Sequence, residues 1–594
     1  MPLKPAHWAS LVPRNPAEQK PNHYLEMARV AWENRGQLPF AWRILGQGTC
    51  DGCAPGTTGL RDWTLEGIHL CMVRLELMRL DTMPALDPAR LADVAALRPL
   101  RSKDLRALGR LPEPMIRRKG DRGFRDVDNS ARLCHAASTV AMKRTVGYGA
   151  TTCSYTDWIG SDLIVFFGSN TPNNQRVTMK YLYHARRKGA KVAVVKPYFE
   201  PGLKRYWVPS VPDSAVFGTK FADCWFPVDT GGDLAFLNGV LKVLTAEGWV
   251  DHDFNARSTT GFAEAAAHVA AQDWETLEAE SGTSRATMRR FAEMLRDAKN
   301  GIFVWSMGLT QHAHGVDTVQ ALMNVGLARG WVGREKAGMM PIRGHSGVQG
   351  GAEVGCAPGL EEPHSTRFAQ VWGFPCPSFK GLTASEMVDA ADRGALDAFW
   401  MVGGNFMETL PDPAAVAQGP ARVGTRIHQD IVASSMMPRP RRHRGPVPVH
   451  DALRVARRGT ETSTERRIIF SPEVPGRRIG SAKPEWEVFG EVAARVRPDR
   501  AEKVRFSSSQ QIRDEIARAV PLYAGIERLS AQGDQFQWGG PRLLADGVFN
   551  TPDGKARFTA VTPPHRRAPE GMFHVSTRRG KQFSTPWSST RRTR

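Results

Sequence analysis

Glycine and hydrogen-bonding side chains are concentrated around one arginine, Arg343, in the segment MMPIRGHSGVQGGAEVG at residues 339–355. Glycine allows positive φ angles and a close approach of the backbone to a ligand. The guanidinium of Arg343 presents a planar fork of N–H donors that suits a carboxylate or a phosphate. The segment is therefore predicted to be an irregular loop at a binding site. A flexible surface loop is the alternative, because glycine clusters are common in loops.

A second candidate for chemistry is the adjacent pair Cys134 and His135, at the start of a helix predicted to run through Met142. A helix dipole lowers the pKa of a thiol at the N-terminus, so a thiolate there is a good soft metal ligand. An imidazole titrates near neutral pH and can relay a proton. A purely structural Cys-His pair is the alternative.

Two cysteines, Cys50 and Cys53, are separated by two residues in the turn-rich segment 46–56. A turn can bring both sulfurs to one metal ion or one edge of a cluster. A redox dithiol and a chance spacing are the alternatives. Cys71 is either a further ligand or a buried helical cysteine, and no fourth cysteine has a convincing spacing.

Strands and helices must position these residues. A buried strand within 161–170, a helix over 175–188 and a strand over 191–196 predict a parallel βαβ unit. A second α/β unit is predicted to repeat the scheme with two strands and two helices, at 301–305, 316–329, 384–393 and 397–402. Ligands bind at the carboxyl ends of such strands, although no GxGxxG motif indicates a nicotinamide dinucleotide.

Two blocks of sequence, QHAHG at 311–315 and RGHSGVQG at 343–350, lie about thirty residues apart. In this order they resemble the catalytic subunits of molybdopterin oxidoreductases, and more narrowly the formate-dehydrogenase-like alpha subunits. The resemblance covers most of residues 20–110, 129–434 and 459–583. It implies a molybdenum or tungsten bis(molybdopterin guanine dinucleotide) cofactor. It also implies two-electron oxidation or reduction of a small anionic substrate such as formate, with an electron-acceptor protein that the sequence does not identify.

The same resemblance implies roles for individual residues. Cys134 would ligate molybdenum, His135 would handle protons, and Arg343 would hold the substrate or, alternatively, a cofactor phosphate. Cys50 and Cys53 match the first pair of the four cysteines that hold a [4Fe–4S] cluster. The residues that match cofactor contacts of the family are Gly168, Ser169, Asn170, Gly308, Gln311, His312, Gly315, Gly344, His345, Gln349, Gly403, Asn405, Gln429, Asp430, Thr577 and Arg578. His345 stands where many formate dehydrogenases have glutamine, which puts formate itself in question.

The expected fold is α/β, with two Rossmann-like parallel-sheet domains around a cofactor cleft. A small N-terminal cluster-like segment precedes them, and a C-terminal β-barrel domain is truncated after its first strand at 573–583. The expected divisions are an N-terminal extension at 1–84, the oxidoreductase core at 85–470, a connecting region at 471–560 and the start of the barrel at 561–594.

Composition narrows the class of protein. With 41% apolar residues in 594, the chain is predicted to be globular, and eight cysteines fit thiols or metal ligands in a reducing compartment. No run approaches the length of about 18 apolar residues that a membrane span needs, and residues 1–12 contain no secretory or twin-arginine signal. The expectations are a cytoplasmic protein without a membrane span.

The net charge of +20 could suggest a nucleic-acid partner. However, three stretches of +6 each, at 101–125, 435–458 and 577–594, carry most of it. They contain neither interleaved aromatics nor a known reading motif, so nucleic-acid binding is the less favoured alternative, which a strong salt dependence of DNA binding would support.

These basic stretches also coincide with the three places where the family resemblance stops. We hypothesise that they were read out of frame, which would make them disordered loops because they lack an amphipathic period and apolar surface. An inactive, truncated or frameshifted relic of the family is therefore an alternative to an active enzyme. The neighbouring reading frames of the encoding DNA test this hypothesis.

Overall fold

A computed structural model describes most of the chain, namely residues 23–50, 57–61, 63–69, 72–87, 100–111, 130–360, 362–377, 379–410, 413–436, 444–448, 459–476 and 479–565. Several sequence expectations lie outside these residues and stay predictions. They concern Cys53, Cys71, the barrel strand at 573–583 and its residues Thr577 and Arg578.

The centre of the molecule is a five-stranded sheet in the order β10-β9-β3-β4-β7, in which every pairing is parallel. Its strands are β3 (Leu163–Phe167), β4 (Lys191–Val195), β7 (Cys224–Phe226), β9 (Gly301–Trp305) and β10 (Gly338–Pro341). All of the carboxyl ends therefore meet at one edge, where parallel sheets bind ligands. The predicted α/β class with a parallel βαβ unit is confirmed.

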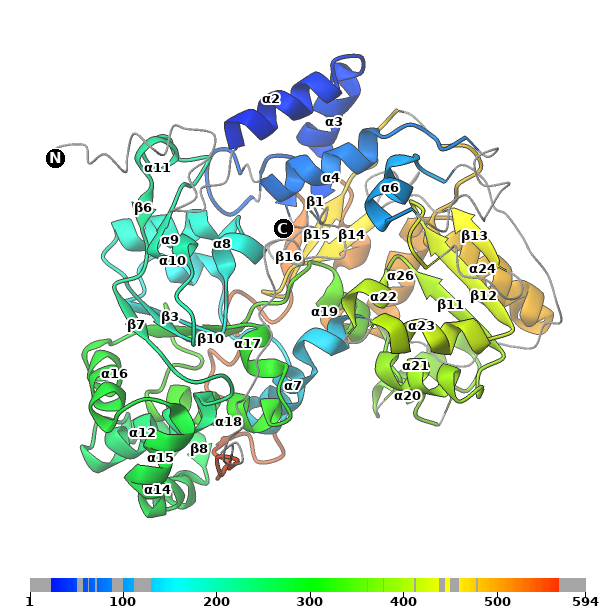
Figure 1. The fold of residues 1–594 in the computed structure, drawn as a ribbon. Helices are drawn as coiled ribbons and strands as arrows, with labels where there is room; N and C mark the ends of the chain where they lie inside the picture. Colours follow the sequence, from blue (N-terminus) through cyan, green and yellow to red (C-terminus); the bar gives the residue numbers. More distant parts are fainter. Residues whose placement is uncertain are drawn as a thin grey trace.

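Helices cover both faces of this sheet, because its strands are apolar on both sides. Along β3, Leu163, Val165 and Phe167 belong to one buried cluster, whereas Ile164 and Phe166 belong to another. The first cluster includes residues of α12 (Asp233–Ala246), α16 (Arg285–Asp297) and α18 (Gly315–Ala328), and the second includes residues of α9 (Thr178–Arg187). Figure 1 shows α9 on one side of β3 and α12 and α16 on the other. Such uninterrupted apolar strands are typical of buried parallel sheets.

A second parallel sheet consists of β11 (Ala398–Val402), β12 (Thr425–Asp430) and β13 (Arg444–Pro448). It lies on the right of Figure 1 beside α21 (Ala384–Asp392) and α23 (Pro413–Arg422). The prediction that the strand at 301–305 opens this second unit is wrong, because β9 pairs with β3 along its whole length. β9 is fully buried and suits the middle of a sheet, whereas β11 is partly exposed.

Two of the basic stretches contain regular structure within the described residues. β13 lies inside the stretch 435–458 and pairs with β12 through its backbone, and α6 (Ser102–Ala107) lies inside the stretch 101–125. The expectation of disordered loops is wrong for these residues, since backbone pairing requires no apolar side chains. Most of the remaining residues of the three stretches lie outside the description.

Three helices at the N-terminal end form a small separate core: α2 (His23–Glu33), α3 (Leu38–Gln47) and α4 (Met72–Thr82). Figure 1 shows them together at the top of the molecule. The short strands β1 (Thr49–Cys50) and β2 (Thr57–Thr58) follow α3 and pair antiparallel.

The segment 339–355 is more regular than predicted. Its start belongs to β10, and residues 348–353 form the short helix α19 (Val348–Glu353). The irregular part is therefore confined to about residues 342–347, which follow the carboxyl end of β10 directly. Arg343 therefore lies at the edge of the sheet where parallel sheets bind ligands.

An antiparallel sheet contacts the loop at residues 342–347. It contains β14 (Gly459–Thr462), β15 (Arg467–Ser471) and β16 (Gln535–Gln537). The turn between β14 and β15 is buried, and within it Arg466 has a φ of 70° and is fully covered. Its guanidinium donates hydrogen bonds to the backbone carbonyls of Thr151, Trp538 and Gly540.

The other longer helices are α13 (His252–Ser258), α14 (Phe262–Ala271), α15 (Trp274–Ser281), α20 (His364–Trp372), α24 (Glu485–Val496) and α26 (Ser509–Ala519). Late in the chain, β17 (Ala556–Arg557) pairs parallel with β8 (Thr259–Thr260). Of the helices described, none is long and apolar enough to cross a membrane.

Two glycines hold the turns after β3 and β9 in contact. A Cβ atom on Gly308 would lie 2.5 Å from Cα of Gly168, and one on Gly168 would lie 2.7 Å from Cα of Gly308. The Gly308 N–H donates to the Gly168 carbonyl at 3.2 Å. Packing alone therefore requires glycine at both positions, which were predicted as cofactor contacts.

Replacing Gly308 by alanine should lower the free energy of unfolding by about 1–3 kcal/mol, the usual cost of overpacking. Gly344→Ala is the matched control, because no atom lies within 4 Å of a Cβ added there. Urea unfolding followed by circular dichroism measures both. Equal stability of the two variants would show that the two turns are not in contact.

Candidate functional site

Helix α7 (Ser130–Val146) carries the predicted metal ligand and proton relay. Its geometry breaks at His135, where φ is −132° and ψ is 22°. The predicted helix is confirmed, since α7 begins at Ser130 and runs past Met142 to Val146. Cys134 directly precedes the break, near the start of the longer helical part that follows His135, and its side chain is partly exposed.

His135 is buried, and both of its ring nitrogens have partners. Nε2 lies 2.9 Å from the Ile342 carbonyl, which can only accept, so Nε2 carries the proton. Nδ1 then accepts from the Ser138 hydroxyl at 3.0 Å, and that hydroxyl accepts from Trp305 Nε1 at 2.9 Å. Burial, and next the charge of Arg343, lower the pKa of His135 to about 3. The expectation of an imidazole that titrates near working pH is therefore wrong for this arrangement.

Arg343 is also buried, with 5% of its surface exposed. Its Nη1 donates to Gln349 Oε1 at 2.8 Å, and its Nη2 donates to the Gly149 carbonyl at 3.0 Å. Burial lowers the pKa of the guanidinium, and the charges of Glu353 and Cys134 oppose this effect. Within the described residues, Nε makes no hydrogen bond, so one donor of the fork stays available.

Contacts between distant segments bring the edge of the central sheet to these residues. The Thr310 hydroxyl, after β9, donates to the Cys134 carbonyl at 2.6 Å. The Gln175 amide, after β3, donates to the Arg343 carbonyl at 3.5 Å. The Ser169 hydroxyl, after β3, accepts a hydrogen bond from the Ser306 hydroxyl, after β9, at 3.1 Å. The structure therefore places Cys134, His135 and Arg343 together where β3, β9 and β10 end.

Four buried polar atoms just beyond β3 have no hydrogen-bond partner in the described part of the chain: Asn170 Oδ1, Thr171 Oγ1, Gln175 Oε1 and Arg176 Nε. Buried polar groups are seldom left unsatisfied, because desolvation without a partner costs free energy. Both donors and acceptors are present, so these atoms fit the polar edge of a bound organic group. They are compatible with the pterin dinucleotide expected from the sequence.

The second sheet presents its own predicted contact residues. Gly403, with a φ of 59°, follows β11 and donates to the carbonyl of Gln429 at 2.8 Å. Gln429 is fully buried, and its Nε2 has no partner among the described side chains and backbone groups. Asn405 and Asp430 are buried nearby in sequence, and burial raises the pKa of the Asp430 carboxyl. A polar ligand is therefore chemically compatible here too.

The remaining predicted contacts lie in two loops. His312 donates through Nε2 to a backbone carbonyl of the turn after β9 at 2.8 Å, and Gln311 is exposed. A Cβ on Gly315 would meet the preceding turn at 2.6 Å, so packing explains that glycine. Gly344 and His345 are partly exposed beside Arg343. These positions stay predicted cofactor contacts.

Cys50 is buried at the end of β1. Among the residues that the structure describes, no group of three or more histidine, cysteine, aspartate or glutamate side chains is arranged to hold a metal ion. Because Cys53 and Cys71 lie outside the description, the iron–sulfur cluster stays a prediction.

Sequence reasoning missed several residues that fix the site. Ser138 and Thr310 hold α7, Gln175 holds the Arg343 backbone, and Glu353 accepts from Gln349 at 2.8 Å. The four-residue spacing of Gln349 and Glu353 could have indicated their contact in a helix. Thr310 and Gln175 carry no local signal, because their partners are distant in sequence.

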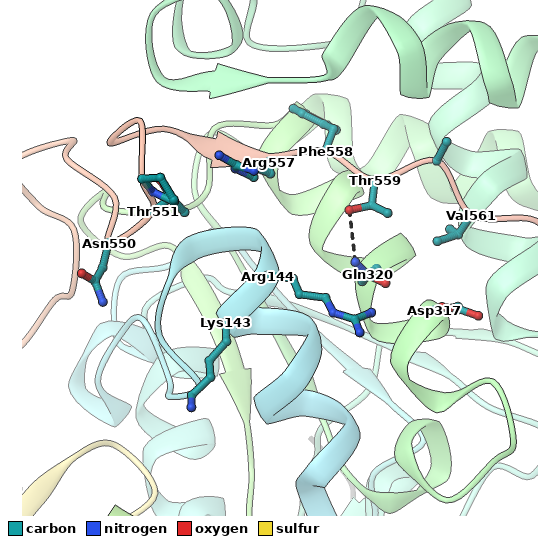
Figure 2. A pocket seen from close by; sticks show the side chains of 12 residues that line it. Lys143, Arg144, Asp317, Gln320, Asn550, Thr551, Arg557, Phe558, Thr559 and Val561 are labelled. Carbon is teal, nitrogen blue, oxygen red and sulfur yellow. Dashed lines mark hydrogen bonds between the residues drawn. The ribbon is translucent and has the colours of Figure 1, made fainter. Parts of the chain in front are cut away.

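A hollow of about 610 Å³ lies at the end of α7 far from Cys134 (Figure 2). Lys143 and Arg144 line it from α7, and Arg557 lines it from β17. Gln320, another lining residue, donates to the Thr559 hydroxyl at 3.1 Å. None of the predicted site residues lines this hollow, so it is distinct from the site around Cys134 and Arg343.

Known proteins provide an independent comparison. The family model described as Molybdopterin oxidoreductase matches residues 113–435. The probable oxidoreductase YjgC of Bacillus subtilis (strain 168) is 29% identical over 485 residues, which cover 77% of this chain and 46% of that protein. Formate dehydrogenase H of Escherichia coli (strain K12) is 26% identical over 463 residues, covering 73% and 60%. The chain spans about half the length of the curated relatives it matches.

A solved structure supports the fold. Acetylene hydratase from Pelobacter acetylenicus is similar over 72% of this chain and 58% of its own, with a TM-score of 0.51 and 16% sequence identity. This likeness concerns the mixed α/β fold with parallel sheets. The family resemblance predicted from the two sequence blocks is confirmed.

Ser138→Ala should lower the free energy of unfolding by about 1–3 kcal/mol, because it leaves the buried Trp305 N–H without an acceptor. Thr145→Val on the same helix is the control, since the Thr145 hydroxyl only back-bonds to the Ala141 carbonyl at 2.9 Å. Chemical denaturation compares the two variants. Equal losses would show that the Trp305 contact contributes nothing specific.

Proposed function

The chain belongs to the molybdopterin oxidoreductase family, and on this basis we propose that it is a formate-dehydrogenase-like catalytic subunit. The proposed reaction is the two-electron oxidation or reduction of a small anion at a molybdenum bis(molybdopterin guanine dinucleotide) centre. One observation carries the proposal. A buried guanidinium with an available N–H donor, that of Arg343, interacts electrostatically with the partly exposed thiol of Cys134.

The buried polar atoms without partners support the proposed cofactor. Those of Asn170 and Gln175 lie beyond β3, and that of Gln429 lies on β12. We propose that they bind polar edges of the pterin dinucleotides, with the Cys134 thiolate as the protein ligand of the metal. When bound, the molybdenum–pterin group supplies the two-electron chemistry. Every other contribution comes from the position and charge of this chain's side chains.

In this proposal Arg343 binds the anionic group of the substrate through Nε–H and a neighbouring N–H, a geometry that suits a carboxylate. Thr310 fixes the Cys134 backbone, which keeps the thiol next to the arginine. His135 is neutral and donates to Ile342, so its proposed contribution here is to hold the chain directly before Arg343. A proton relay through Nε2 would first require this hydrogen bond to break.

Formate is the nearest candidate substrate, because it appears in the names of several relatives. Because His345 stands beside Arg343 where many formate dehydrogenases have glutamine, other small anions are alternative substrates. An electron-acceptor protein is proposed as the partner. An iron–sulfur cluster on Cys50, Cys53 and further thiolates would carry electrons between the substrate site and that partner. An iron assay of anaerobically prepared protein tests for this cluster.

The purified chain should contain molybdenum or tungsten and pterin, and Cys134→Ala should lose turnover while keeping most of the pterin, because separate loops hold the dinucleotides. Metal analysis by mass spectrometry, pterin fluorescence and dye reduction with formate measure these properties. Full activity of the alanine variant would make Cys134 structural. Absence of pterin from the wild-type chain would favour an inactive relic.

Arg343→Lys keeps the charge but loses the two-pronged fork, so kcat/KM should fall roughly 10- to 100-fold, or about 1–3 kcal/mol. Arg329→Lys is the matched control, because Arg329 is a half-buried arginine that donates to the Trp249 carbonyl away from the site. Steady-state kinetics with formate decide the outcome. Unchanged kinetics in Arg343→Lys would remove this residue from the substrate site.

A further inference from the structure

A chain of hydrogen bonds connects Arg343 through the partly buried carboxylate of Glu353 to Tyr523. Arg343 Nη1 donates to Gln349 Oε1 at 2.8 Å, and Gln349 Nε2 donates to Glu353 Oε1 at 2.8 Å. The other carboxylate oxygen, Oε2, accepts from the Tyr523 hydroxyl at 2.5 Å. Arg343, Gln349 and Tyr523 are each at most 5% exposed. These residues will be called the Glu353 network.

The direction of each bond in the network is determined by chemistry. An ionised carboxylate only accepts hydrogen bonds, so Gln349 must turn its NH₂ group toward Glu353. Its carbonyl oxygen therefore faces the guanidinium, as the contact with Arg343 requires. With the amide reversed, NH₂ would face N–H donors of Arg343, and both groups would lose a partner. Glu353 thus selects one orientation of Gln349, and that orientation holds Arg343.

Packing leaves this network little freedom to rearrange. Gln349 and Glu353 are four residues apart on α19 and therefore share one face of the helix. On the same helix, a Cβ on Gly350 would lie 2.4 Å from Thr462 Oγ1 of β14, so α19 is pressed against that strand. Tyr523 follows α26, and its hydroxyl oxygen lies 3.5 Å from that of Thr462. Three distant parts of the chain therefore define the position of the carboxylate.

Charge strengthens the connection between the ends of the network. Burial lowers the pKa of Arg343, and Glu353 is the first of the charges that oppose this effect. Burial raises the pKa of Glu353, and hydrogen bonds from Tyr523 and Gln349, with the charge of Arg343, oppose that effect. Each charge thus favours the ionised form of the other. In addition, the network binds the guanidinium through Nη1 and leaves Nε without a partner among the described residues.

We infer that Glu353 is a positioning residue that acts through Gln349 to aim the free N–H donor of Arg343 at a small anionic substrate. The inference rests on the proposed function, in which Arg343 binds that anion. Glu353 does not contact the anion itself, because two negative groups would repel each other. It acts as the fixed counter-charge on the far side of the guanidinium, with Tyr523 holding it in place.

The inference is tested by formate binding to the purified holoprotein, measured as the rise in melting temperature with sodium formate against sodium chloride at equal ionic strength. Glu353→Gln removes the charge at nearly constant volume and should weaken formate binding about tenfold. Its molybdenum and pterin contents should equal those of the wild type. Glu515→Gln is the matched control, since Glu515 accepts from Trp372 Nε1 at 2.8 Å on α26, and it should bind formate normally.

A double-mutant cycle separates this inference from the proposed function. If Glu353 acts through Arg343, Glu353→Gln should have little further effect in the Arg343→Lys background. Weak binding by Arg343→Lys together with normal binding by Glu353→Gln would overturn the inference alone. Normal binding by Arg343→Lys, or no formate binding by the wild type, would overturn the proposed function as well.

A second variant covers the case in which Glu353→Gln does not fold. Tyr523→Phe keeps the charge of Glu353 and removes one of its hydrogen-bond donors. It should weaken formate binding by a smaller factor, about threefold, in the same melting assay. Unchanged binding in this variant, at wild-type cofactor content, would show that the network only stabilises α19.

Discussion

The burial of the Arg343 guanidinium is the constraint around which the site is arranged. An ion taken out of water requires both hydrogen-bond acceptors and a counter-charge. Here the acceptors come from Gln349 and Gly149, and the counter-charge is Glu353. Gln349 and Glu353 lie on α19, whereas Gly149 follows α7 and is far from them in sequence. Satisfying one cation therefore requires α7, α19 and the carboxyl edge of the central sheet to be assembled together.

The turn between β14 and β15 holds this assembly in place. The backbone N–H of Arg343 donates to the Thr464 hydroxyl at 3.2 Å, and that hydroxyl donates to the Pro341 carbonyl at 3.0 Å. Two residues later, Arg466 binds backbone carbonyls of segments that surround the turn. The Thr464 side chain of this turn thus satisfies backbone groups of the loop before α19. Hydrogen bonds in this way connect Arg343, the residue proposed to bind the substrate, to a distant hairpin.

Sequence patterns predicted the local elements well and the long-range ones less well. The strands at 163–167, 191–195 and 301–305 are apolar runs bounded by turn residues, and each formed as expected. Which sheet β9 joins could not be read from its own residues, because strand pairing is decided by partners elsewhere. Among the candidate site residues, Cys134, His135 and Arg343 were predicted from their chemistry and their family pattern. Ser138, Gln175 and Tyr523 were missed because ordinary polar residues become informative only once their partners are known.

The contact between Gly168 and Gly308 has a consequence for how sequences of this kind are compared. Each glycine is required by the backbone of the other, so both positions should be invariant among relatives whether or not a dinucleotide binds beside them. Invariance at these turns therefore carries no information about retained activity. A chain that had lost its cofactor would still need both glycines for as long as it folded. Active and inactive members are better separated by Gln175 and Gln429, because one buried polar atom of each, Gln175 Oε1 and Gln429 Nε2, has no partner within the described part of the chain.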